Sequence, residues 1–150
     1  RQMCIRDRAL AVLEDVQPPE KALEMRGLVA GNKATCFLAA GEMDRAQTAM
    51  DELRRIAADR SCKKEFVQKA RHTLGYLQLC MDIARGRHAD VGALQKDFES
   101  SRAPLHRLDV QYRIALALRH RGDRTGMEKS REYLLENSGG TCYGELARAL

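Results

Sequence analysis

Apolar side chains recur every three or four positions along residues 20–40, stop at a single glycine, and resume at the same spacing after it. The central stretch, residues 31–53, reads GNKATCFLAAGEMDRAQTAMDEL. This spacing is typical of one face of an α-helix, and glycine readily adopts the positive φ that ends a helix. Because so short a turn sends the second helix back along the first, the pattern predicts an antiparallel helical hairpin around Gly41. Its apolar positions are Leu23, Met25, Val29, Cys36, Phe37 and Ala40, then Met43, Ala46, Met50, Leu53 and Ile56.

The same order of helix, glycine and helix recurs around Gly86 and Gly122. Helix starts are expected shortly after the three glycines, at Asp44, Asp90 and Thr125. We therefore predict an all-α fold, an α-solenoid of about three antiparallel helical hairpins plus a C-terminal helix. A globular helical bundle without repeat symmetry is the alternative, because hairpins of this length occur there too. The recurring apolar stripes are Phe66, Ala70, Leu74, Leu77, Met81 and Ala84, then Val91, Leu94 and Phe98, and Leu108, Tyr112, Ala115 and Leu118, then Met127 and Leu134.

Residues 27–60 resemble a tetratricopeptide (TPR) repeat, a helical hairpin of about 34 residues. The family has a small residue and an aromatic residue in its first helix, which Ala34 and Phe37 match. Its turn glycine matches Gly41, and its alanine five residues later matches Ala46. A larger side chain at that alanine would push the two helices apart. Asn32 also fits, whereas Ala30 replaces the usual Trp and Ala58 the usual Pro.

The two later hairpins resemble the family less closely. Val91 occupies the alanine position of the middle pair, and Met127 occupies it in residues 108–137. The matching residues of that last hairpin are Ile114, Ala115, Leu118, Gly122 and Asp123. Together the three hairpins cover about 110 of the 150 residues as a TPR-like repeat.

The resemblance implies a binding function. In the TPR family one face of the first helix of each pair lines a concave groove, and such grooves bind peptides and proteins. The resemblance therefore implies a scaffold or adaptor whose partner is a protein or peptide. Of the clamp with which some TPR domains grip a C-terminal carboxylate only Arg113 fits, which disfavours that ligand. For Tyr76 and Tyr112, packing between repeats is an equally weighted alternative. Carried over by position, the groove holds Leu28, Asn32, Thr35, Leu38, Thr73, Tyr76, Leu77, Cys80, Ile83, Asp109, Tyr112 and Arg113.

Basic side chains gather at the second and third glycine turns, whereas the first turn does not share this bias. Arginine near a helix C-terminus interacts favourably with the helix dipole, and this structural interpretation has the greater weight. The functional interpretation is a basic rim that attracts an acidic partner, and it supports nucleic-acid binding as the alternative function. The rim consists of Arg85, Arg87, Arg119, Arg121 and Arg124, with His88 and His120 beside them.

The first eight residues, RQMCIRDR, resemble the translation of a sequencing adapter, and we treat residues 1–8 as an artefactual extension. The chain carries 26 basic and 21 acidic residues, a net charge of +5. Without the three Arg and one Asp of residues 1–8 it would be +3, which is small for a nucleic-acid-binding protein. We expect residues 9–150 to form a single TPR-like domain, itself a fragment of a longer chain. An accessory helical region of a larger enzyme or membrane-anchored protein is a further alternative.

The sequence gives no support for catalysis. The cysteines after residue 8 are widely spaced, without a C-x-x-C pair, and no His lies at metal-ligand spacing. There is no phosphate-binding loop and no Cys or Ser placed with a His as a nucleophile. We therefore predict no enzymatic activity, no catalytic or metal-binding residues, no cofactor and no membrane-spanning segment. Reduced cysteines favour a cytoplasmic or cytoplasm-facing location.

Overall fold

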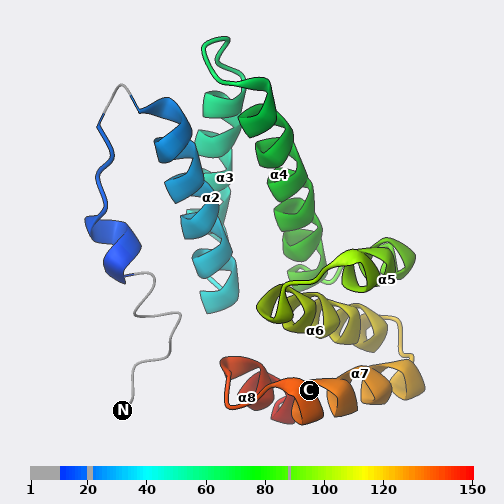
Figure 1. Cartoon of the computed structure of the whole chain (residues 1–150). Coiled ribbons are helices and arrows are strands. Elements are labelled where there is room, and N and C mark those ends of the chain that lie inside the picture. Colours follow the sequence, from blue (N-terminus) through cyan, green and yellow to red (C-terminus); the bar gives the residue numbers. More distant parts are fainter. Residues whose placement is uncertain (1–10, 20–21, 88) are drawn as a thin grey trace. The chain divides into compact units, whose positions relative to one another are not determined.

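The computed structural model of the chain describes residues 11–19, 22–87 and 89–150. In these ranges all regular structure is helical and no strand occurs, so the all-α prediction is confirmed. The expected artefact at residues 1–8 and the basic-turn residue His88 lie outside the described residues. After a short helical stretch at residues 11–15, the helices are α2 (Leu23–Ala40), α3 (Met43–Ala57), α4 (Lys64–Ala84), α5 (Val91–Ser100), α6 (Pro104–His120), α7 (Arg124–Asn137) and α8 (Cys142–Arg148) (Figure 1).

The three predicted glycine turns are present and share one geometry. The φ angles of Gly41, Gly86 and Gly122 are 78°, 71° and 75°. At the first turn Gly41 N–H donates to the carbonyl of Leu38 at 3.2 Å, and Glu42 N–H donates to that of Phe37 at 2.9 Å. The same two bonds recur at the other two turns. This is the Schellman arrangement, in which a left-handed glycine satisfies the last carbonyl groups of a helix.

The predicted helix starts are only partly correct. Asp90 does cap α5, because its carboxylate accepts a hydrogen bond from Ala93 N–H at 3.1 Å. The prediction that α7 starts at Thr125 is wrong. Asp123 caps this helix instead, because its carboxylate accepts a hydrogen bond from Gly126 N–H at 2.9 Å. Asp44 lies inside the first turn of α3, where its charge faces the positive end of the helix dipole.

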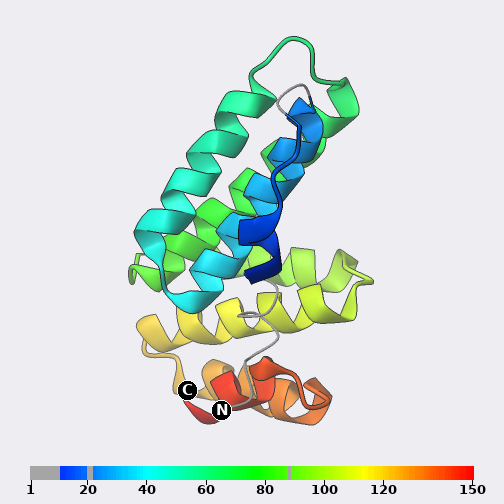
Figure 2. The ribbon, with the colours of Figure 1, turned by 90° about the vertical axis from the view of Figure 1, so that its left-hand side faces the viewer.

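The helices form two compact units, one ending at Met81 and one from Asp82 to Leu150. In the first unit α2 and α3 lie side by side as an antiparallel pair (Figure 1 and Figure 2). Ala46 is fully buried where the two helices meet. Leu77, Cys80 and Met81 of α4 complete this core, and Phe66 and Ala70 join a second cluster with Ala30, Leu53 and Ile56. The single-domain and solenoid expectations stay predictions.

The buried face of α2 differs from the predicted stripe. Met25 is 54% exposed, and Ala40 is exposed as well. Glycine and alanine residues of α2 face the interior in their place, because helices can pack most closely where side chains are short. The buried residues are Gly27, Ala30, Gly31, Ala34, Phe37 and Leu38.

In the second unit α6 packs against α5, α7 and α8, and α7 also packs against α8. Its core contains Leu108, Leu134, Tyr143 and Ala147. Arg107 fixes the loop between α5 and α6: its guanidinium lies 4.0 Å from the centre of the Phe98 ring and donates to the Phe98 carbonyl at 2.8 Å.

Candidate functional site

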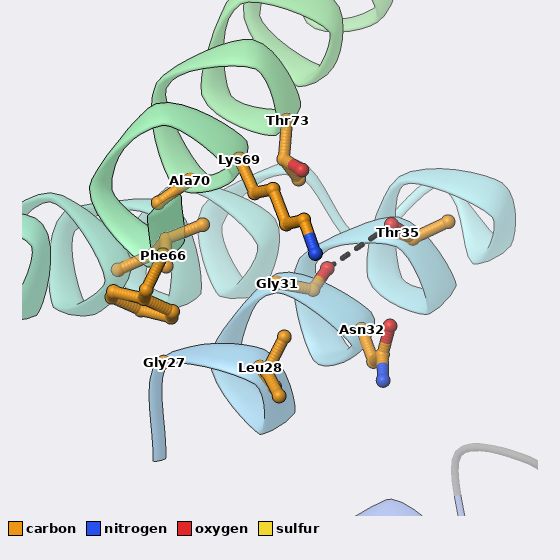
Figure 3. Close-up of a pocket in the computed structure, with 10 residues that line it drawn as sticks. Gly27, Leu28, Gly31, Asn32, Thr35, Phe66, Lys69, Ala70 and Thr73 are labelled. Atoms are coloured by element: carbon orange, nitrogen blue, oxygen red, sulfur yellow. Dashed lines mark hydrogen bonds between the residues drawn. The ribbon is translucent and has the colours of Figure 1, made fainter. Parts of the chain in front are cut away.

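A hollow of about 90 Å³ lies between α2 and α4 in the first unit (Figure 3). Glycine, alanine and apolar side chains form most of its lining, with a few polar groups among them. Ligand sites have a similar chemical character, mostly apolar with a small number of polar groups, but small-molecule pockets measure about 300–1,000 Å³. A hollow of about 90 Å³ is of a size for a single side chain. The lining residues are Gly27, Leu28, Gly31, Asn32 and Thr35 from α2, Leu53 from α3, and Phe66, Lys69, Ala70 and Thr73 from α4.

Two glycines one turn apart on α2 give the hollow its shape. At Gly27 the helices approach closely, because a Cβ there would lie 2.4 Å from Cζ of Phe66. At Gly31 a Cβ would lie 3.5 Å from Leu53 Cδ2 and 3.8 Å from Thr73 Cγ2, which are ordinary contact distances. The helices therefore approach each other closely at Gly27, whereas at Gly31 the missing side chain leaves space.

Polar groups stand around this space. The Thr35 hydroxyl donates to the carbonyl of Gly31 at 3.0 Å (Figure 3). Asn32 is exposed, and its amide forms no hydrogen bond with any described residue. Lys69 is exposed on α4 and reaches toward Gly31 in Figure 3. Within the described part of the chain Lys69 has no ion-pair partner. The hollow thus combines an apolar interior with an available amide and an available positive charge.

Some of the groove residues predicted for the first unit line this hollow, and others do not. Leu28, Asn32, Thr35 and Thr73 line it. Leu38 and Leu77 are 4% and 2% exposed and belong to the core, so a partner cannot contact them in this conformation. Tyr76 is half-buried and packs against the same core. Sequence reasoning missed Gly31, Phe66 and Lys69, although a pair of glycines inside a predicted helix is itself a signal of close packing.

In the second unit Tyr112 and Arg113 lie against α8 rather than in an open groove. The Tyr143 hydroxyl donates to Asp109 Oδ1 at 2.9 Å, and Arg113 Nη2 lies 3.5 Å from the same oxygen. The rings of Tyr112 and Tyr143 are 6.4 Å apart between centroids. Arg113 is only 6% exposed, so it cannot meet an outside ligand in this conformation. This part of the predicted groove is an internal polar network.

The two basic turns of the second unit lie next to each other. Arg121 donates to the carbonyl of Ala89, and a Cβ on Gly86 would lie 3.9 Å from the His120 ring. Arg87 pairs with Asp82 at 3.1 Å, so part of the rim's charge is compensated. All five arginines of the rim, Arg85, Arg87, Arg119, Arg121 and Arg124, are exposed.

Residues 11–19, 22–87 and 89–150 hold no cluster of His, Cys, Asp and Glu that suits a metal ion. Desolvation raises the pKa of the Cys62 thiol, and the carboxylates of Asp59 and Glu24 raise it further. A nucleophilic cysteine needs the opposite shift. In the same ranges no helix has both the length and the apolar character to cross a bilayer.

No family model, curated protein or solved structure matches the chain. The TPR relationship therefore stays a resemblance, carried by Ala34, Phe37, Gly41 and Ala46 of the sequence.

Proposed function

We propose that the chain is a non-catalytic, TPR-type helical-repeat module that binds a peptide segment of a partner protein in the hollow between α2 and α4. One observation carries the proposal. Leu28, Asn32, Thr35 and Thr73, which the repeat register selects as groove residues, all line one hollow in the structure. Leu28 is 59% exposed, so its apolar side chain is accessible to a ligand at the edge of the hollow.

The non-catalytic part of the proposal has separate support. A nucleophilic cysteine needs a lowered pKa, whereas desolvation raises the pKa of the Cys62 thiol, so Cys62 is not suited to this role. Cys36, Cys62, Cys80 and Cys142 are thiols in the structure, which supports a cytoplasmic or cytoplasm-facing location as a further part of the proposal.

A matched pair of substitutions on α2 tests peptide binding. Leu28 and Met25 are both large, apolar and more than half exposed on one helix, but only Leu28 lines the hollow. Peptides selected from a random display library on the full chain should bind Leu28→Ala about tenfold more weakly, because truncation of an apolar contact costs about 1–2 kcal/mol. Met25→Ala should bind within about twofold of the unchanged protein. Equal affinities for the two variants, measured by fluorescence anisotropy, would refute the use of this hollow.

Nucleic-acid binding at the basic rim is the second candidate. The adjacency of the two basic turns favours it, because arginines from both turns would then act on one strand. Acidic residues between the arginines weigh against it, among them Asp82, which pairs with Arg87. RNA or DNA affinity that falls steeply with salt and is lost in Arg119→Ala would support this candidate, and absence of binding at low salt would exclude it.

A further inference from the structure

We propose that the hollow binds an aliphatic side chain of an extended peptide, and that Lys69 recognises an acidic residue next to that side chain. This inference rests on the function proposed above and adds the chemistry of the partner. Three properties of the hollow support it: its size, its single charge and its available amide.

The size favours an aliphatic side chain over an aromatic ring. The hollow measures about 90 Å³, whereas an apolar protein cavity that accepts benzene measures about 150 Å³. Phe66 and Leu53 already bound the space, and α2 and α4 lie close together at Gly27, which limits the width of the hollow at that end. A branched aliphatic group such as that of Val, Leu or Ile therefore fits better than Phe or Tyr.

The charge favours a carboxylate. Lys69 is the charged residue of the lining, and no acidic side chain lines the hollow with it. Several arginines of the same unit are already compensated: Arg26 pairs with Glu52 at 3.3 Å, and Arg45 pairs with Glu42 at 2.7 Å. Lys69, which is without such a partner among the described residues, leaves its charge available to a ligand. A carboxylate beside the inserted side chain would meet this ammonium at the mouth of the hollow.

The available amide favours an extended backbone. Asn32 and Thr35 stand one helical turn apart on α2, and Figure 3 shows both on the side of the hollow opposite α4. The Asn32 amide has both a donor and an acceptor, which is the pair that one peptide unit requires. A segment whose backbone bonds to Asn32 would carry its neighbouring side chains toward the hollow and toward Lys69.

A charge reversal tests the inference. A library of random 12-residue peptides, flanked on both sides by Gly-Ser linkers so that no terminal carboxylate takes part, is selected on the full chain and on Lys69→Glu. We expect the unchanged protein to enrich Val, Leu or Ile beside Asp or Glu. Lys69→Glu should enrich the same aliphatic residues beside Lys or Arg, and should bind the originally selected peptide about three- to tenfold more weakly.

Arg71→Glu is the matched control, because Arg71 is an exposed cation two residues further along α4 that does not line the hollow. Its selected peptides should retain the acidic preference. If the unchanged protein enriches peptides without a charge preference, if Lys69→Glu keeps the acidic preference, or if aromatic residues are preferred, the inference is overturned while the proposed function stands on the Leu28→Ala result. If the unchanged protein enriches no peptide at all, the proposed function and this inference both fail.

Discussion

The first and third hairpins use the same three helix positions in opposite ways. Counted back from the turn glycines Gly41 and Gly122, Leu28, Gly31 and Asn32 of α2 correspond to Asp109, Tyr112 and Arg113 of α6. On α2 these positions line an open hollow, whereas on α6 they contact one another and Tyr143 of α8. A repeat position therefore does not by itself make a binding site. Whether such a position is open to a ligand depends on the size of its side chain and on whether a neighbouring helix covers it.

The largest expected effect comes from breaking the covered face. Asp109→Ala removes an acceptor of Tyr143 and an ion-pair partner of Arg113, whose side chain is only 7% exposed. We expect the free energy of unfolding, measured by urea denaturation, to fall by about 3 kcal/mol, because the buried Arg113 charge loses one of its compensating interactions.

Two controls sharpen this test. Asp109→Asn keeps the shape and an acceptor for Tyr143, so its loss should be smaller. Asn32→Ala, at the position of α2 that corresponds to Arg113, should change stability by less than about 0.5 kcal/mol because Asn32 is exposed. Equal losses for Asp109→Ala and Asn32→Ala would mean that the two faces do not differ as described.

An intermediate effect is expected where each hairpin crosses. Ala46 is fully buried between α2 and α3, so Ala46→Leu should lower the free energy of unfolding by about 1–3 kcal/mol through overpacking. Thr48→Leu, an exposed position of the same helix, should cost less than about 0.5 kcal/mol. A variant Ala46→Leu that melts at the temperature of the unchanged protein would contradict a tight crossing.

The third hairpin tolerates Met127 at the corresponding position for a visible reason. Its close approach involves the preceding residue, because a Cβ on Gly126 would lie 3.1 Å from Leu118 Cδ1. Met127 itself is only half-buried.

The smallest effects concern the two glycines of α2, and here we expect opposite signs. Gly27→Ala should lower the free energy of unfolding by about 1 kcal/mol or more, because its Cβ would clash with Phe66. Gly31→Ala should raise it by about 0.5–1 kcal/mol, because its Cβ has room and alanine favours the helix.

Gly31→Ala should nevertheless weaken peptide binding, since the added methyl group fills part of the hollow. Gly75→Ala is the control: a Cβ there meets nothing within 4 Å and the residue does not line the hollow. It should stabilise α4 in a thermal melt without any change in peptide affinity. If Gly31→Ala destabilises the protein, the space beside Gly31 is not available.

Sequence reasoning predicted the helices and turns well because their causes are local. The positive φ of Gly41, Gly86 and Gly122 follows from the absence of a side chain, and Asp90 caps a helix with its own carboxylate. Sequence reasoning failed where residues far away in the sequence determine which face of a helix is buried. Met25 belongs to the apolar stripe that the helical spacing predicts, but it is exposed in the structure. The spacing does not show that α3 and α4 cover the face of α2 that carries Gly27 and Gly31.

The candidate site was predictable in part for the same reason. The repeat register found Asn32 and Thr35, which lie on the correct face of α2. It did not exclude Leu38 and Arg113, whose burial depends on the core of the first unit and on α8. The register did not find Lys69, because that lysine matters through its position at the hollow and the lack of an ion-pair partner among the described residues, which only the positions of the surrounding side chains reveal.

The contact between Gly27 and Phe66 also has a consequence for the order in which this part of the molecule assembles. The pair α2 and α3 joins segments that follow each other in the chain and can form early, whereas Phe66 closes a longer loop. Until that ring docks, only α3 covers the glycine side of α2, through Ile56 and Leu53. A nascent chain from which α4 has not yet emerged would therefore expose apolar surface of α2 and α3 that Phe66 and Ala70 later cover.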